Sequence, residues 1–397
     1  MRINYGQSVH NNKEIDAVIK VLRSSTQMGN NVKKFEKEIS KIFSKKYGVM
    51  VNSGSSALFL AFKILNLPKN SNVITPVLNF GTAISAILEN NLIPNFIDVE
   101  LDTYCIDTNK IEKQINSKTK AMCIPNLIGN LPNWIKLRKI ANKYNLLVIE
   151  DSADTIGARY NSKSTGQYSD ISISSFYGSH VINCAGNGGI LCTSNKEWSN
   201  EAKVLRSWGR SSSLFKESEN INKRLNYKIG KINYDAKFIF EKIGYNFEPS
   251  EISAAFGLVQ IKKLGLFIKK RKENFKKHYN FFNHYKNLFL NPRVLNKTDS
   301  CFLAYPIQLN YKKIERKKLQ IFLEKNDIQT RVIFTGNILK QPGFKKIKYI
   351  GNKNDFKNAD QIMRDGLLIG CHQGIHDEGI KYMHSKIKEF VSKQIWK

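Results

Sequence analysis

The chain has 397 residues, of which 41% are hydrophobic, and it carries a formal net charge of +30 at pH 7. This apolar share is enough for a sizeable packed core and excludes wholesale disorder. No stretch of about 18 apolar residues is present, which excludes a transmembrane helix. Residues 1–6 lack an apolar signal core, so we expect a cytoplasmic protein rather than a secreted one.

The positive charge comes from lysines spread along the whole chain among abundant asparagine and isoleucine, which indicates a compositional bias. We therefore expect no nucleic-acid partner and no membrane partner, although the charge would attract an anionic substrate. Six cysteines are scattered without a Cys-x-x-Cys pair or another close ligand spacing. They predict reduced structural thiols and neither a metal site nor an iron–sulfur cluster.

The first half of the chain predicts helices followed by an alternation of strands and helices. Residues 11–46 are helical in pattern, with one break at 28–31. From 48 to 195, short apolar runs alternate with helical stretches. The expected strands are 49–51, 72–75, 94–98, 121–124 and 146–150, and the expected helices are 57–65, 83–89 and 133–144. Such an alternation predicts an α/β fold with a mostly parallel sheet.

The second half begins with a polar stretch at 211–235, which predicts a long loop or an insertion. Helices are expected at 251–264 and over about 265–290. Later residues mix strands and helices, with strands at 302–308 and 329–333 and helices at 314–325 and 380–391. We therefore expect a large α/β domain over 1–265 and a smaller α+β domain over 266–397.

Three short motifs carry chemistry, and the first is Asn-Ser-Gly-Ser-Ser-Ala at 52–57. It lies between an expected strand and an expected helix. The glycine permits close backbone approach, and hydroxyls and amides at a helix N-terminus favour a phosphate. Ser55 and Ser56 are the candidate contacts. Taken alone, the motif is equally compatible with an ordinary helix start.

The second motif is Ile-Glu-Asp-Ser-Ala-Asp at 149–154, directly after an apparently buried strand. Ligands of α/β sheets bind at the carboxyl ends of the strands. Asp151 is placed to pair with a protonated ring nitrogen, and Asp154 to reach a neighbouring ring substituent. A helix cap is the structural alternative.

The third motif is Ser-Ser-Phe-Tyr-Gly-Ser-His-Val at 174–181, followed by a glycine-rich turn at 185–189. A lone histidine such as His180 is more often a packed or surface residue than a catalyst. Its unperturbed pKa, however, lies near physiological pH, so it can move protons. The order of the three motifs along the chain favours one shared site. A further segment of small residues at 244–257 predicts a dimer or domain contact.

Together these motifs resemble those of the DegT-type sugar aminotransferases and their dehydratase relatives, which have fold type I among pyridoxal-phosphate enzymes. The resemblance covers nearly the whole chain and rests on residues 28–29, 51–57, 150–157, 174–189, 244–246, 334–337, 341–342 and 370–374. Where His180 stands, the family usually has a lysine that anchors the cofactor, and imidazole cannot form that Schiff base. His180 and Gly-Cys-His-Gln at 370–373 are similar to the 3-dehydratase branch.

The resemblance implies a fold type I enzyme that acts as a homodimer and binds pyridoxal phosphate or pyridoxamine phosphate non-covalently. It implies a nucleotide-diphosphate sugar and L-glutamate as partners, and no iron–sulfur cluster. Its motifs place Ser55, Ser56 and Ser175 at the cofactor phosphate, Asp151 at the pyridine nitrogen, Asp154 near the ring hydroxyl, Phe80 stacked on the ring, and Asn246 at the phosphate of the neighbouring subunit.

The chain also departs from the family pattern at several positions. Glu248 stands where members usually carry arginine. Asp154 is one methylene shorter than the usual glutamate or glutamine. The stretch after His180 is longer than usual, which predicts a cofactor loop of different shape.

The function implied by the resemblance is a nucleotide-sugar 3-dehydratase that removes the C3 hydroxyl of a nucleotide-linked 4-keto-6-deoxyhexose. His180 would be the catalytic base and glutamate the amino donor. A nucleotide-sugar aminotransferase that tolerates histidine, a catalytically inactive cofactor-binding protein and a nucleic-acid-binding protein remain alternatives. The identities of the nucleotide and the hexose stay open.

Overall fold

The computed structural model describes residues 1–215, 221–310 and 313–395. Its centre is a seven-stranded sheet in the order β1-β9-β8-β5-β4-β2-β3. Only β9 runs against its neighbours in this sheet, so the expected mostly parallel α/β architecture is confirmed. The strands are β1 (Tyr47–Val51), β2 (Asn72–Pro76), β3 (Ile93–Ile97), β4 (Thr119–Pro125), β5 (Leu147–Asp151), β8 (Ile171–Ser175) and β9 (Gly189–Thr193).

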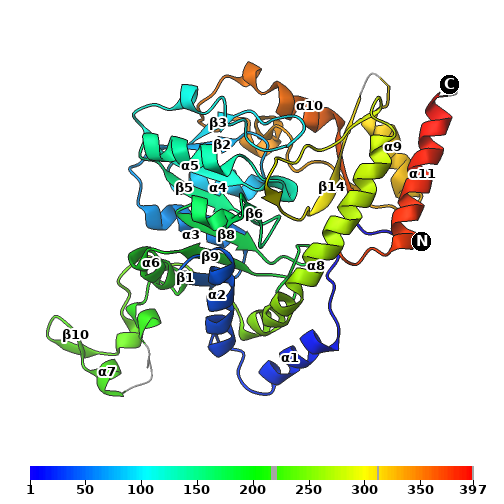
Figure 1. Ribbon diagram of the computed structural model, residues 1–397. Helices are drawn as coiled ribbons and strands as arrows, with labels where there is room; N and C mark the ends of the chain where they lie inside the picture. Colours follow the sequence, from blue (N-terminus) through cyan, green and yellow to red (C-terminus); the bar gives the residue numbers. More distant parts are fainter. Residues whose placement is uncertain (216–220, 311–312, 396–397) are drawn as a thin grey trace.

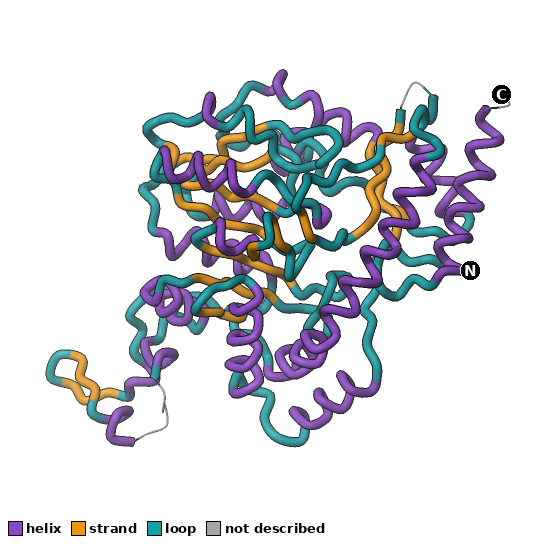
Figure 2. Tube along the Cα trace, viewed as in Figure 1, coloured by secondary structure: helices purple, strands orange, loops and turns teal. Residues whose placement is uncertain are grey.

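Helices cover both faces of the central sheet (Figures 1 and 2). On one face α3, α4 and α6 contribute to a large apolar cluster, and on the other face α2 and α5 pack against the strands. The helices of this part are α1 (Asn12–Leu22), α2 (Asn30–Ile42), α3 (Gly54–Leu65), α4 (Gly81–Glu89), α5 (Trp134–Lys143) and α6 (Lys196–Arg206).

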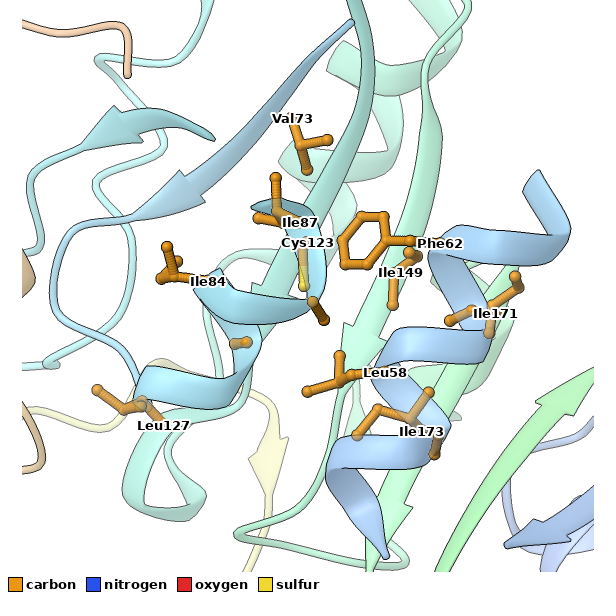
Figure 3. Close-up of a cluster of buried hydrophobic side chains, with 14 of the residues drawn as sticks. Leu58, Phe62, Val73, Ile84, Ile87, Cys123, Leu127, Ile149, Ile171 and Ile173 are labelled. Carbon is orange, nitrogen blue, oxygen red and sulfur yellow. The ribbon is translucent and has the colours of Figure 1, made fainter. Parts of the chain in front are cut away.

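The packing of α3 onto the sheet shows why most strands were recognisable from the sequence. Phe62 and Leu58 of α3 lie against Cys123 of β4 and Ile149 of β5 (Figure 3), and each is at most 4% exposed. Strands that are buried on both faces form continuous apolar runs. β8 was not predicted, because its buried serines interrupt the apolar run. These serines form hydrogen bonds inside the core, as Ser172 does by donating to Glu150.

A second, four-stranded sheet in the order β12-β14-β16-β15 lies in the C-terminal part. Its strands are β12 (Phe289–Leu290), β14 (Ala304–Leu309), β15 (Thr330–Arg331) and β16 (Gly366–Gly370), accompanied by α9 (Arg316–Lys325), α10 (Lys357–Asp365) and α11 (Asp377–Ile395). A bridge between Ile3 and Ile328 joins the first residues of the chain to this part. The division into 1–265 and 266–397 stays a proposal.

The helix α8 (Glu251–Asn283) is one continuous element of 33 residues, where the sequence predicted two helices meeting near 265. Gly265 lies at that point, and a glycine inside a helix costs only about 1 kcal/mol, so the helix can continue through it. A Cβ on Gly265 would meet nothing within 4 Å, so no close packing explains the glycine. In Figure 1, α8 runs from the edge of the central sheet to the second sheet.

Residues 208–215 and 221–243, which we call the arm, project from the body of the molecule (Figure 1). The sequence analysis expected a long loop or an insertion at 211–235, and where the structure describes this stretch it contains α7 (Ile221–Leu225), β10 (Tyr227–Ile229) and β11 (Ile232–Tyr234). Residues 216–220 of that stretch lie outside the described residues. Both strands of the hairpin are largely exposed, so no apolar alternation marks them in the sequence.

Two further features complete the fold. A small sheet joins β6 (Arg159–Tyr160), β7 (Lys163–Ser164) and β13 (Thr298–Asp299). None of the helices in the described ranges has the length and apolarity that a membrane crossing requires.

Candidate active site

A cavity of about 400 Å³ opens at the carboxyl ends of the parallel strands, where α/β sheets bind ligands. Leu58, Leu127 and Ile173, which Figure 3 labels, line it from the side of the core. The structure brings most of the predicted site residues together here, because the lining includes Ser55, Phe80, Asp151, Asp154, Ser175 and His180. Ser56 and Asn246 are not part of the lining.

Asp151 ends β5, and Asp154 follows it in the same wall of the cavity. Asp151 accepts a hydrogen bond of 3.0 Å from the Ala153 amide, and Asp154 accepts one of 2.8 Å from the Ile128 amide. Burial raises the pKa of Asp151 to about 6 and that of Asp154 to about 7, because few groups replace the lost water. Both carboxyl groups therefore favour a cationic neighbour.

A buried polar network beneath Asp151 fixes the end of β5. Asn126 donates to Glu150 at 3.0 Å and accepts a bond of 2.9 Å from the indole nitrogen of Trp134. The backbone amide of Asn126 also donates to the carbonyl of Asp151 at 2.9 Å. Because every link is a hydrogen bond inside the core, displacing Asp151 would leave several buried polar groups unpaired.

His180 also lines the cavity, in the segment after β8, which is the strand next to β5 in the sheet. Its Nδ1 is 3.0 Å from the carbonyl oxygen of Ser175. A carbonyl can only accept, so Nδ1 carries the hydrogen and Nε2 of the neutral ring has the free lone pair. Burial, assisted by the charge of Arg271, lowers the pKa of His180 to about 4. The imidazole is therefore neutral near pH 7 and is able to act as a base.

Close backbone approach joins the first motif to the third. A Cβ on Gly54 would lie 2.6 Å from the Cβ of Ser175, so only glycine fits at the start of α3. Ser55 and Ser175 both line the cavity beside this helix N-terminus, which favours an anion. Ser56 instead donates to the side-chain oxygen of Asn52 at 2.6 Å and lies outside the lining.

Aromatic side chains border the opening of the cavity. Phe80 is 53% exposed and meets Phe334 edge to face, with 6.2 Å between the ring centroids. Phe334 has a left-handed φ of 45°, which an aromatic residue adopts only at a cost. Thr335 holds the Phe334 segment in place by donating to the carbonyl of Asn79 at 2.7 Å. An exposed Phe80 is available for stacking on a planar ligand.

Asn246 and Glu248 lie outside the cavity of this chain. Asn246 is exposed and forms a bridge with Ser207 at the base of the arm. Many large apolar residues of the arm are also exposed, with Ile243 at 92% and Phe240 at 60%. The geometry of a single chain therefore leaves the predicted contact of Asn246 with a neighbouring subunit as a proposal.

Tyr5 is a lining residue that the sequence analysis missed. Nothing in Asn4-Tyr5-Gly6 signals a site, and Tyr5 reaches the cavity only because Ile3 pairs with Ile328. Burial and the carboxylate of Asp154 both raise the pKa of Tyr5 well above its usual range. Its ring closes the wall between the two aspartates and the second sheet.

The residues present fit a pyridoxal-type cofactor. Among the described residues, neither Asp151 nor Asp154 has a cationic partner, and a protonated ring nitrogen would supply one. Ser55 and Ser175 beside a helix start suit the phosphate. No lysine lines the cavity within the described ranges. No group of three or more histidine, cysteine or acidic side chains there could hold a metal ion, and all six cysteines are buried.

Comparison with known proteins places these features in a family. Residues 9–388 match the model of the DegT/DnrJ/EryC1/StrS aminotransferase family. The chain is 33% identical over 370 residues to the lipopolysaccharide biosynthesis protein RfbH of Salmonella typhimurium, covering 90% of this chain and 84% of that one. It is 30% identical to the GDP-4-keto-6-deoxy-D-mannose 3-dehydratase of Escherichia coli O55:H7, covering 97% of this chain and all of that one (100%).

A solved structure of GDP-4-keto-6-deoxymannose-3-dehydratase with a trapped PLP-glutamate geminal diamine superimposes with a TM-score of 0.87. It is 27% identical in sequence, and the match covers 97% of this chain and 99% of the other.

Proposed function

The chain belongs to the DegT/DnrJ/EryC1/StrS aminotransferase family of pyridoxal-phosphate enzymes, and from that premise we propose that it is a nucleotide-sugar 3-dehydratase. The substrate class is a nucleotide-linked 4-keto-6-deoxyhexose, and the bond broken is that between C3 and its hydroxyl. The observation that carries the proposal is His180 in a cavity whose described lining contains no lysine.

We assign the cofactor to groups on both walls of the cavity. Asp151 would pair with the pyridine nitrogen, Asp154 would approach the ring hydroxyl, and Phe80 would stack on the ring. Ser55 and Ser175 would contact the phosphate. Ser56, the residue after Ser55, would lie behind them, outside the lining. When bound in its amine form, the cofactor supplies a nitrogen for condensation with the C4 ketone and a ring that accepts electrons.

His180 would accept a proton during the reaction and later donate it. Its Nδ1 is held by the carbonyl of Ser175, so Nε2 is the atom that accepts the proton. Its lowered pKa means that the free imidazole is ready to accept, and that the imidazolium readily gives the proton up again. We propose that the imidazolium donates to the departing C3 oxygen, which leaves as water. Closure by Tyr5 and Phe334 would keep bulk water from the reacting atoms.

The nitrogen is consumed in each turnover and must be restored. Release of the 3-deoxy ketosugar by hydrolysis gives ammonia, so an amino donor is required. We propose L-glutamate, in keeping with the adduct named for the similar solved structure. The same His180 Nε2 would move the proton in this half of the cycle.

The second candidate is a C4 aminotransferase, which the family description favours. The two functions differ in the fate of nitrogen, because the aminotransferase retains it in the sugar and the dehydratase releases it. Incubation with ¹⁵N-glutamate and a nucleotide-linked 4-keto-6-deoxyhexose separates them. Labelled ammonia with an unlabelled sugar supports the dehydratase, and a labelled sugar contradicts it.

We propose that the enzyme acts as a homodimer. Several large apolar side chains of the arm, including Ile221, Ile232 and Phe238, are exposed, and apolar side chains gathered at a surface are typical of an interaction site. Asn246 lies at the base of the arm, outside the cavity of its own chain. A second copy that covers the arm would bring Asn246 to the cofactor phosphate of the partner.

The decisive test uses pyridoxal phosphate, L-glutamate and borohydride. We expect the absorbance of the aldehyde form to give way to that of the amine form on addition of glutamate. Borohydride added before glutamate should fix no adduct to the protein. His180→Lys should become fixable by borohydride and shift toward transamination. A wild-type protein that is itself fixed by borohydride would contradict the lysine-free site, and full dehydratase activity in His180→Lys would contradict the role of His180.

A further inference from the structure

The segment Gly-Cys-His-Gln-Gly at 370–374 marks the similarity to the 3-dehydratase branch but has no role in the reaction described above. It follows β16 and passes behind the wall that contains His180. Gln373 is 9% exposed and Arg271, on the neighbouring α8, is 0% exposed. A buried glutamine and a buried arginine side by side require an explanation, because both are costly to remove from water.

Hydrogen bonds connect these two residues to the His180 segment. The Nε of Arg271 donates to Oε1 of Gln373 at 2.6 Å. The Nε2 of Gln373 donates to the carbonyl of Val181 at 3.1 Å. Val181 directly follows His180, so Gln373 holds the backbone on one side of the histidine while the Ser175 carbonyl holds its ring.

Arg271 also holds a second part of the cavity wall. Its Nη1 donates to the carbonyls of Phe302 at 3.1 Å and Leu303 at 2.9 Å. Leu303 lines the cavity. One guanidinium therefore fixes, directly or through Gln373, two segments that are distant in sequence and border the same cavity.

The charge of Arg271 is unusual in its surroundings. None of its hydrogen-bond acceptors is a carboxylate, and within the described residues it forms no salt bridge. Burial of an arginine without an acid partner is expensive, and burial lowers its pKa. The positive charge disfavours a second positive charge nearby, and His180 is near enough for its pKa to be lowered by Arg271.

We propose that Gln373 and Arg271 are positioning residues for His180. Gln373 fixes the backbone that aims Nε2 at the reacting atoms, and the charge of Arg271 favours the neutral imidazole that acts as a base. The proposal rests on the function proposed above. It gives a physical role to the glutamine of the 370–374 segment and to the buried arginine of α8.

Other ionisable groups near His180 come from several elements. Asp151 and Asp154 line the same cavity at the end of β5, and Tyr5 belongs to the N-terminal segment. Tyr177 lies on the same segment as His180, with 6.1 Å between the ring centroids. The two aspartates oppose Arg271 when they are ionised, so a test must alter the charge on the Arg271 side alone.

Two near-isosteric substitutions separate the hydrogen bond from the charge. Gln373→Met removes both hydrogen bonds and leaves Arg271 charged. Gln373→Glu retains an acceptor for Arg271, loses the donor to Val181 and adds a negative charge. The matched control is His278→Asn, because His278 donates from α8 to the Gly370 carbonyl at 3.1 Å without contacting the His180 segment.

The first readout is the titration of His180 in the protein without cofactor, followed by ¹⁵N NMR of the imidazole and assigned with His180→Gln. In wild-type protein His180 should stay neutral down to about pH 5, and Gln373→Glu should raise its midpoint by about one unit. His278→Asn should not move it. An unchanged midpoint in Gln373→Glu overturns the role of the charge.

The second readout is the rate of conversion of bound pyridoxal phosphate to the amine form by L-glutamate. Gln373→Met should lower this rate by about tenfold to a hundredfold, as expected for misplacement of a catalytic group, while pyridoxal phosphate affinity stays within about twofold. An unchanged rate overturns the role of the hydrogen bond. The NMR titration does not depend on turnover, so a wild-type protein without dehydratase activity would contradict the proposed function and still test this inference.

Discussion

The two walls of the cavity bury ionisable groups in the same way and shift them in opposite directions. In the wall formed by the end of β5, burial raises the pKa of Asp151 to about 6, and in the wall formed by the segment after β8 it lowers the pKa of His180 to about 4. Each group moves toward its neutral form, because burial penalises charge of either sign. The difference shows what each wall offers a ligand: the aspartates favour a cation beside them, and the histidine is kept neutral with a lone pair that can accept a proton.

The walls also differ in construction. The β5 wall is the end of a regular strand above a buried polar network, whereas the His180 wall is an irregular segment held by side chains from the C-terminal part. The first is a rigid part of the sheet, and the second depends on contacts between distant parts of the chain. The following substitutions test that contrast.

The largest effect is expected on the His180 wall. His180→Gln removes the group that moves the proton, so the glutamate-dependent conversion of pyridoxal phosphate should slow by about a thousandfold. Stopped-flow absorbance measures the rate, and equilibrium dialysis should show cofactor affinity within a few-fold of wild type. The matched control is the exposed His376→Gln. A fall in this rate of less than tenfold in His180→Gln would contradict the role of His180 in proton transfer.

On the β5 wall, Asp151→Asn should separate function from stability. Without the carboxylate opposite the pyridine nitrogen, turnover should fall by about a hundredfold. The protein without cofactor should become more stable at pH 8, by at most about 3 kcal/mol, because a folded-state pKa near 6 penalises the ionised aspartate.

The sign of this stability effect follows from the raised pKa. The aspartate penalises the folded state only when it is ionised there, so the gain in Asp151→Asn should be complete above about pH 6 and vanish near pH 4. Urea unfolding at several pH values measures it, with the exposed Asp16→Asn as control. A gain that persists unchanged at pH 4 would contradict the assigned cause.

A smaller effect tests whether the cofactor site of one chain needs a second copy of the protein. Phe240→Ser combined with Ile243→Ser removes two of the most exposed apolar side chains of the arm. We expect sedimentation to show a monomer where wild type is a dimer, with cofactor affinity weakened about tenfold because Asn246 of the partner is lost. Ile321→Ser on α9, also exposed, should leave the dimer intact. A wild-type monomer would refute the shared site.

The smallest effect distinguishes two neighbouring serines at the start of α3. Ser55 lines the cavity, whereas the Ser56 hydroxyl bonds to Asn52. Ser55→Ala should weaken pyridoxal phosphate binding by about fivefold to tenfold, near the upper end of the net value of one ordinary hydrogen bond. Ser56→Ala should change it by less than twofold. Equal losses would show that the helix start as a whole, rather than the cavity lining, governs phosphate binding.

The β5 wall was predictable from the sequence, and the His180 wall only partly so. Asp151 follows a continuous apolar strand, and that pattern alone places it at a ligand-binding edge. His180 was recognised through its surroundings in the chain, but its supports were not. Gln373 was noticed only as part of the resemblance at 370–373, and nothing local gives its role or marks Tyr5, because both roles depend on contacts with residues far away in sequence. α8 was predicted as two helices meeting near 265, because no local signal shows that the helix continues through that point.

The bridge between Ile3 and Ile328 has a consequence for how the chain folds during its synthesis on the ribosome. Tyr5 is synthesised among the first residues, yet it reaches the cavity only after Ile328 has emerged and its bridge to Ile3 has formed. Gln373 is made later still, and domains generally fold as units during synthesis. The nascent chain therefore has no complete cofactor pocket. Binding of the cofactor becomes one of the last events in the maturation of the protein.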